Sequence, residues 1–225
     1  MQKTFSQNSP RFIILLGPHG SGKGTQARML SSRFGISHLS TGNLIRREIG
    51  NGTSLSELAK SYLDKGDYLP DDIMNKFVSS LLKNPEYSAG AIFDGYPRTK
   101  TQAEFLDSII SDYIVVYLNI KDASLQERFR GRLICTKGHV FHKVFNPPKI
   151  AGKCDIDGLP LSEREDDTNS ALIDERIRNY HKLSEPLISY YLGKGVLVEI
   201  DADKPIEEVF KDIVNKISIY DRAAK

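Results

Sequence analysis

The segment GPHGSGKGT, residues 17–25, constrains the fold of this chain more than any other feature. It follows the apolar run Phe12–Leu16, which is typical of a buried strand, and it precedes a stretch with helical spacing of apolar residues. The pattern Gly17-x4-Gly22-Lys23 between a strand and a helix is that of a phosphate-binding loop. Glycines let backbone N–H groups face phosphate oxygens, and the helix N-terminus adds partial positive charge. The sequence therefore predicts that residues 17–25 bind phosphate groups.

One detail of this loop departs from the strict pattern. Gly24 stands where such loops usually carry Ser or Thr, and the hydroxyl comes one residue later, at Thr25. A plain glycine-rich turn with a solvated Lys23 is the alternative interpretation. The flanking strand and helix favour the phosphate loop, because a plain turn requires neither of them.

Alternating strand and helix patterns predict the class of fold. Short apolar runs predict strands at residues 12–16, 37–39, 91–94, 113–120 and 196–200. Helical spacing, with Ser/Thr-x-x-Glu capping patterns at Ser54, Thr101 and Ser124, predicts helices at residues 25–34, 41–49, 54–65, 101–109 and 124–133, after Pro70, from about 172 and after Pro205. Pro186 is expected to kink or restart the helix that begins near residue 172. This alternation favours an α/β fold with a parallel sheet covered on both faces.

The pattern changes between Leu133 and Asp167. Helical spacing ends there, and Gly, Pro, His and Lys accumulate around short strand-like segments. We expect a small β-rich insertion at this place, in a chain that is otherwise an alternating α/β protein.

Composition excludes several classes of function. Lys and Arg number 31 against 29 Asp and Glu, so the net charge is only +2 and a nucleic-acid-binding coat is not expected. The longest apolar run, residues 113–118, is far shorter than the ~20 residues of a membrane span, and the N-terminal residues lack the apolar core of a secretory signal. With only two cysteines, the chain is expected in a reducing compartment; the cytoplasm is favoured, and an organelle reached without a cleaved signal is the alternative. We also expect a monomer without nucleic-acid or membrane partners.

Seven motifs that occur in order carry a family resemblance. They are GKGTQ at 22–26, LSTGNLIRRE at 39–48, FDGYPRTKTQA at 93–103, RFRGR at 128–132, FNPPK at 145–149, REDD at 164–167 and DERIRNYH at 174–181. The series closely resembles adenylate kinase, the family of nucleoside monophosphate kinases that interconverts ATP plus AMP with two ADP. The resemblance covers residues 11–217. The stretch between Arg132 and Asp167 matches the long-lid form of the family.

The resemblance implies a division of the chain into three parts. A P-loop NTPase core with a five-stranded parallel sheet flanked by helices would comprise residues 1–39, 70–131 and 170–225. Residues 40–69 would form a helical insertion that binds the nucleoside monophosphate. Residues 132–169 would form a β-rich lid.

The resemblance also assigns an ATP site. The residues it implies are Gly20, Ser21, Gly22, Lys23, Gly24, Thr25, Arg128, Arg132 and Lys204. The first six would wrap the phosphates, Arg128 would stack on the adenine, and the backbone carbonyl of Lys204 would meet the same base. Asp94 would order the water shell of Mg²⁺, the expected cofactor.

A second set of residues would hold AMP and the transferring group. The AMP set is Thr41, Arg46, Gly95, Arg98, Gln102, Arg164 and Arg176, and the catalytic set is Lys23, Arg98, Arg132, Arg164 and Arg176. Arg46 would bind the AMP phosphate and Gln102 the AMP base. The phosphate of AMP is itself the nucleophile, so the reaction needs concentrated positive charge and no general base. A solvated surface charge is the alternative for each arginine taken singly.

The lid segment poses the question of a structural metal. Some long-lid relatives carry zinc on a Cys-x2-Cys pair and a Cys-x2-Cys/Asp pair. Here Cys154 and Asp157 keep the second spacing, whereas no second cysteine follows Cys135, so that His139 or His142 would have to substitute. A tetrahedral site needs all four ligands in register. We therefore expect the lid to fold without zinc.

Some residues depart from the family pattern, and other functions stay open. Asn43 replaces the usual Asp, Leu133 stands where many members carry Arg, and His19 is unusual in the loop, although its side chain can point outward. A related kinase that uses GTP or another monophosphate is one alternative, and an inactive nucleotide-binding module is another. The complete set of Lys and Arg residues disfavours the inactive module.

Overall fold

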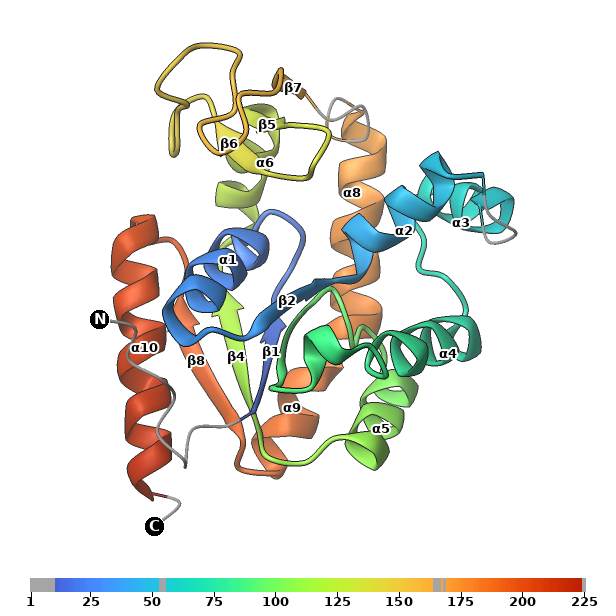
Figure 1. Ribbon diagram of the computed structural model, residues 1–225, viewed down its shortest axis with the longest axis vertical. Coiled ribbons are helices and arrows are strands. Elements are labelled where there is room, and N and C mark those ends of the chain that lie inside the picture. Colours follow the sequence, from blue (N-terminus) through green and yellow to red (C-terminus); the bar gives the residue numbers. More distant parts are fainter. Residues whose placement is uncertain (1–10, 53–55, 164–166, 168, 224–225) are drawn as a thin grey trace.

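The computed structural model describes residues 11–52, 56–163, 167 and 169–223. A five-stranded parallel sheet forms its centre, in the order β2 (Ser37–Ser40), β3 (Ala91–Asp94), β1 (Phe12–Leu16), β4 (Tyr113–Asn119) and β8 (Leu197–Asp201) (Figure 1). This arrangement confirms the predicted parallel sheet. The carboxyl ends of all five strands meet at one edge, where parallel α/β sheets bind their ligands.

Alternate residues of β1, the central strand, pack into two separate hydrophobic cores. Ile13 and Leu15 pack with α1 (Lys23–Phe34), α6 (Asp122–Arg130) and α10 (Ile206–Ala223). Ile14 and Leu16 pack on the opposite face with α4 (Asp71–Leu81), α5 (Lys100–Ile109) and α9 (Pro186–Gly193). Because both faces are covered, the strands read as continuous apolar runs in the sequence.

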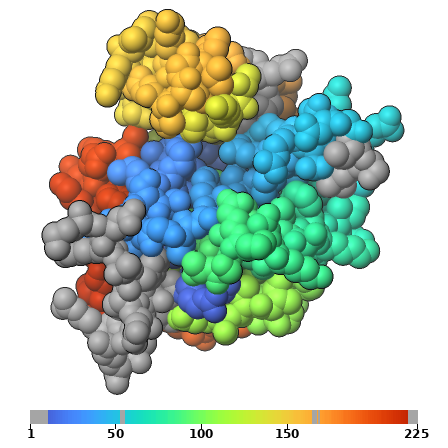
Figure 2. Space-filling model, viewed as in Figure 1, coloured from blue at the N-terminus to red at the C-terminus, as the bar shows by residue number. Residues whose placement is uncertain are grey.

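Two segments project from the core at the carboxyl edge of the sheet. The helical insertion predicted over residues 40–69 contains α2 (Thr41–Gly50) and α3 (Ser56–Leu63), whereas Ser40 belongs to β2 of the central sheet. The lid segment, residues 132–169, contains a second sheet in the order β6 (Val140–His142), β5 (Arg132–Ile134) and β7 (Ser162–Glu163), all antiparallel. Figure 2 shows the lid segment in yellow and orange above the blue core, with the helical insertion in cyan beside it.

The two projections touch each other. A Cβ built on Gly138 of the lid segment would lie 3.1 Å from Nδ2 of Asn43 in α2. On the other side, Nη2 of Arg28 in α1 donates to the carbonyl of Val140 at 3.4 Å. The lid segment therefore lies over the cleft rather than away from it.

The helix that leaves the lid segment is interrupted where its proline predicts. It runs as α8 (Ser170–Asn179), widens into a π-helical turn over Tyr180–Ser184, and continues as α9 from Pro186. Pro186 restarts the helix because it has no N–H to donate and suits a first turn. A short 3-10 turn, Pro85–Tyr87, precedes β3.

Several expected helix boundaries are wrong: α1 begins at Lys23 rather than at residue 25, and α3 ends at Leu63 rather than at residue 65. The proposed cap at Ser54 lies outside the described residues. The cap of α5 is Thr99 rather than Thr101, because Thr99 Oγ1 accepts from the N–H of Gln102 at 3.2 Å. Helix α6 begins at Asp122, before Ser124, and ends at Arg130 rather than near 133. Gly131 ends it, and the following residues pair with β6 and β7 as β5.

Candidate active site

The loop after β1 has the backbone of a phosphate cradle. Gly17, Gly20 and Gly22 adopt φ values of 141°, 85° and 96°, in the region that favours glycine. A Cβ on Gly17 would lie 2.8 Å from the carbonyl oxygen of Leu118, so the close approach of loop and β4 also requires glycine. The turn delivers the chain to the N-terminus of α1, the end of a helix that favours an anion.

Lys23 lies along the inside of this loop. Its Nζ donates to the carbonyls of Gly17 and Pro18, both at 2.7 Å. Burial lowers the pKa of Lys23 from 10.5 to about 8, although the carboxylate of Asp94 opposes that shift. The ammonium group is thus held at the loop in a poorly hydrated place, where an incoming anion would be bound strongly.

Asp94 ends β3 beside the start of α1. Its Oδ2 lies 3.2 Å from Nε2 of His38, and both side chains are only 15% exposed. Burial raises the pKa of Asp94, but the hydrogen bond with His38 and the positive charge of Lys23 outweigh it and bring that pKa to about 2. Asp94 is therefore ionised at neutral pH. His38 was not expected in the site, and its position one strand away from Asp94 becomes visible only from the order of the sheet.

A cavity of about 540 Å³ extends from the loop to the lid segment and α10. The residues expected to hold ATP all line it, namely Gly20, Ser21, Gly22, Lys23, Gly24, Thr25, Arg128, Arg132 and Lys204, together with Asp94. Arg128 and Arg132 reach it from different elements, α6 and β5, although the helix predicted over residues 124–133 would have held both.

The far end of this cavity offers surfaces for a flat ring. Arg128 donates to the carbonyl of Ala202 at 2.6 Å, and its guanidinium lies 5.9 Å from the ring centroid of Phe145. Phe145 is half exposed and belongs to the FNPPK motif. The motif alone did not predict that its aromatic ring contacts Arg128. Lys204 turns its ammonium group away to Asp212 at 2.8 Å, so its backbone rather than its side chain is available here.

A second, smaller cavity of about 50 Å³ adjoins the first. The described residues expected to hold AMP line it, namely Thr41, Arg46, Gly95, Arg98, Gln102 and Arg176. Arg46, Gly95 and Arg98 line both cavities, so they mark the place where the two meet. Apolar side chains of the helical insertion and α4, such as Ile45 and Met74, complete the wall.

Gln102 is buried and already makes hydrogen bonds within the protein. Its Oε1 accepts from the N–H of Arg98 at 2.8 Å, and its Nε2 donates to Oδ1 of Asp71 at 2.8 Å. Thr99 also donates to Asp71, at 2.9 Å. Asp71 therefore supports the amide from behind, a function that the sequence motifs did not reveal.

Asp167 joins two arginines at the lid segment's exit. It forms a bidentate pair with Arg132, and its Oδ1 lies 3.7 Å from Nη1 of Arg176. Asp167 and Arg176 are both buried. Arg164, which was expected beside them, lies outside the described residues.

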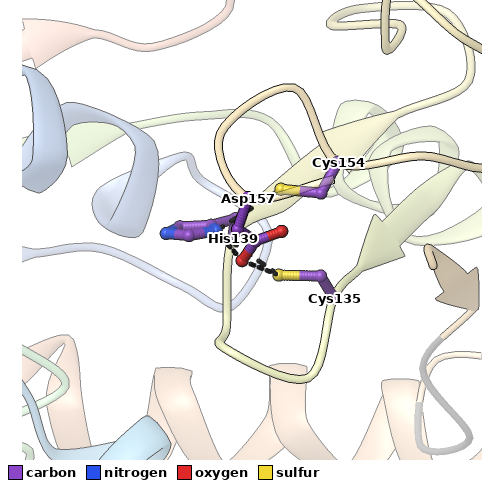
Figure 3. Close-up of side chains that lie close together, drawn as sticks. All are labelled: Cys135, His139, Cys154 and Asp157. Atoms are coloured by element: carbon purple, nitrogen blue, oxygen red, sulfur yellow. Dashed lines mark hydrogen bonds and ion pairs between the residues drawn. The ribbon is translucent and has the colours of Figure 1, made fainter. Parts of the chain in front are cut away.

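The lid segment also gathers four possible metal ligands (Figure 3). Nδ1 of His139 lies 3.4 Å from each of the sulfur atoms of Cys135 and Cys154, and 3.0 Å from Oδ2 of Asp157. Oδ2 of Asp157 lies 3.5 Å from Sγ of Cys135, and all four atoms fall within 4.8 Å of one another. The premise that the ligands would be out of register is therefore wrong.

The structure also distinguishes the two candidate histidines of the lid segment. His142 does not join the cluster, because its Nδ1 accepts from the N–H groups of Val144 and Phe145, at 3.0 and 3.1 Å. His139 does join it, because the turn at Gly138, with φ of 84°, absorbs the additional residue between Cys135 and His139.

Comparison with known proteins gives one consistent result. The family profile described as adenylate kinase matches residues 15–196. The chain belongs to the adenylate kinase family. It is 40% identical to an adenylate kinase of Methanothrix thermoacetophila over 92% of this chain and 99% of that protein. It is 42% identical to one of Staphylococcus epidermidis, over 90% and 97% of the two chains.

Family membership agrees with the geometry of the site. A kinase with two nucleotide substrates requires a phosphate-binding loop, two adjoining cavities and several Lys and Arg side chains around them. Over the part of the chain that the structure describes, no helix has the length and apolarity to cross a membrane.

Proposed function

We propose that the two adjoining cavities bind ATP and AMP with their phosphates meeting at Arg98, and that the adenylate kinase reaction, ATP plus AMP to two ADP, takes place there. The observation that carries this proposal is that Arg46, Gly95 and Arg98 line both cavities. Two nucleotide sites at unrelated places on the protein would share no lining residues. A site for one nucleotide would not need a second cavity whose wall comes from the helical insertion.

The larger cavity suits the triphosphate. The loop N–H groups and Lys23 would bind the phosphates, while Arg128 and Phe145 would enclose the adenine. Mg²⁺ accompanies ATP in this family, and the ionised Asp94 beside Gly24 fits the ordering of its water shell. The metal would neutralise phosphate charge when it is bound.

The lining of the smaller cavity, rather than its volume, points to the monophosphate. Arg46 and Arg98 would bind the AMP phosphate at the junction, and Gln102 with the apolar wall would bind the base. Transfer from one phosphate to the other then needs in-line placement and stabilisation of negative charge. Arg132, Arg164 and Arg176 would supply that charge, and a single arginine of this kind can be worth roughly 10³–10⁵ in rate.

Closure of the two projections would exclude water from the transfer. Residues 40–69 and 132–169 form the rim of the cleft, and they already touch at Gly138 and Asn43. Water that reached the phosphoryl group would hydrolyse ATP without forming ADP from AMP. We propose that both segments close on their substrates, in a monomer of the cytoplasm that needs no nucleic-acid partner.

The geometry also favours a metal in the lid segment, contrary to the expectation from sequence. Zinc bonds of about 2.3 Å to sulfur and about 2.0–2.2 Å to nitrogen and oxygen imply ligand separations of roughly 3.3–3.8 Å in a tetrahedron. Four of the six separations among the ligand atoms of Cys135, His139, Cys154 and Asp157 are 3.0–3.5 Å, and all six lie within 4.8 Å. Such an ion would cross-link two turns of the lid segment and would take no part in the chemistry.

The decisive experiment is an assay of ADP formation over all pairs of nucleoside triphosphates and monophosphates. We expect ATP with AMP to be the best pair. Lys23→Met should lower turnover by at least about a hundredfold while the circular dichroism spectrum stays that of the wild type. Full activity in Lys23→Met would refute the assignment of the loop. A preference for GTP or another monophosphate would instead favour a related kinase.

A further inference from the structure

His19 lies at the junction of the two cavities, and the sequence-based option that it points outward is wrong. It follows β1 in the phosphate loop, is half-buried, and lines both cavities. Its Nε2 lies 3.3 Å from Nη1 of Arg98, a residue that is far away in the sequence. The loop that holds one substrate's phosphates is thus in direct contact with the arginine that serves the other.

The chemistry of the contact fixes the direction of the hydrogen bond. A guanidinium group only donates, so Nε2 of His19 must accept, and the imidazole is then neutral with its proton on Nδ1. Nε of Arg98 is also committed, because it donates to the carbonyl of Gly95 at 2.7 Å. Arg98 has five N–H groups, and three of them remain for phosphate oxygens.

Other contacts hold the same guanidinium in one plane. Its central carbon lies 4.6 Å from the ring centroid of Tyr68, so the aromatic ring supports one face. Gly95 and His19 then fix the rotation of the group within that plane. Of these contacts, only the one with His19 comes from the phosphate loop.

We propose that His19 is a positioning residue, which orients Arg98 toward the AMP phosphate and couples it to the ATP loop. The proposal rests on the function proposed above for Arg98. Without the acceptor on His19, the guanidinium can rotate away from the line of transfer, and a small misplacement of such a group costs rate. His19 itself need not touch either substrate.

Two variants of similar size separate this function from simple packing. His19→Leu removes the acceptor, whereas His19→Gln retains an acceptor at about the reach of Nε2. For His19→Leu we expect a rise of about three- to tenfold in the KM for AMP, a fall in kcat, and a KM for ATP within about twofold of the wild type. His19→Gln should recover most of the loss. Equal kinetics in the two variants, or a larger effect on ATP than on AMP, would overturn the proposal.

A double-mutant cycle with Arg98→Lys tests the coupling directly. Lysine lacks the Nη1 group that His19 contacts, so His19→Leu should change AMP kinetics by less than about 1.5-fold in that background. An undiminished effect there would show that His19 acts independently of Arg98, against the proposal. If Arg98→Lys alone left AMP kinetics unchanged, the function proposed for Arg98 would be wrong. The proposal that His19 positions Arg98 would then fail as well.

Discussion

The metal proposed for the lid segment offers the sharpest test of the structure. Of the described residues in the lid segment, only Cys135, Phe141 and Cys154 make up its buried apolar cluster, with Leu133, Leu159 and Leu161 packed partly against them. Nearby apolar side chains, such as Val144 and Ile156, are exposed. A core this small seldom holds a fold by itself, and a metal is one of the usual additions.

The size of the effect can be worked from the positions of the ligands. The metal would close the chain between Cys135 and Cys154, and a cross-link over a loop of this length is worth about 3 kcal/mol in the entropy of the unfolded chain. For a protein of this size, 1 kcal/mol corresponds to about 2–4 °C in melting temperature. Asp157→Asn or Cys135→Ser should therefore lower the transition that includes the lid segment by about 6–12 °C.

Metal analysis and calorimetry on the same samples decide the question. Protein purified without chelator should contain close to one zinc ion per chain, and cobalt substitution should give the absorption of a tetrahedral thiolate site. Asp155→Asn is a matched control from the same turn, because Asp155 only accepts from the N–H of Lys149 at 2.9 Å and asparagine can do the same. Protein without metal, a melting temperature that chelator does not change, or equal losses in Asp155→Asn and Asp157→Asn would refute the reasoning.

Three further predictions concern the cleft. Because the pKa of Lys23 is about 8 in the free protein, its ammonium form is lost as pH rises through 8, and kcat/KM for ATP should fall above that pH. Lys23→Arg stays charged, so its pH profile should lack this alkaline fall. The same alkaline fall in Lys23→Arg would contradict the assignment. Gln102→Leu should raise the KM for AMP at least several-fold with little change for ATP, and equal effects on both nucleotides would speak against a base contact. Because the substitution removes the donor to Oδ1 of Asp71 and the acceptor of the N–H of Arg98, it should also destabilise the fold by about 1–3 kcal/mol. A bisubstrate analogue should compact the protein in small-angle scattering, and unchanged scattering at saturation would contradict closure of residues 40–69 and 132–169.

The sheet and the phosphate loop follow from local sequence alone. A run such as Tyr113–Asn119 is apolar on both faces, which only a doubly covered strand requires, and the glycines at 17, 20 and 22 serve one backbone path. These signals are strong because each depends on neighbouring residues. The residues that line the cavities follow instead from the resemblance of whole motifs to a known family.

The features that the sequence did not predict depend on contacts between distant segments. The capping patterns at Thr101 and Ser124 are misleading, because Thr99 caps α5 and α6 begins earlier, at Asp122; the strand after Gly131 decides where α6 ends. The sequence names the four possible ligands but gave no reason to expect them together, because a fixed Cys-x2-Cys spacing ignores the wider turn that ends at His139. The direction of His19 could not be known without the position of Arg98.

Asp167 has a consequence for how the cleft receives its substrates. In the structure its carboxylate already pairs with Arg132 and approaches Arg176, and both arginines line the cavities. It acts as an internal counter-ion that keeps the two guanidinium groups ordered between turnovers. When a phosphate arrives, it takes the place of the Asp167 carboxylate at the arginines. When the product leaves, the pairing with Asp167 is restored. Such a site releases nucleotides more readily than one in which every arginine waits for phosphate, as a reversible enzyme that must discharge two molecules of ADP requires.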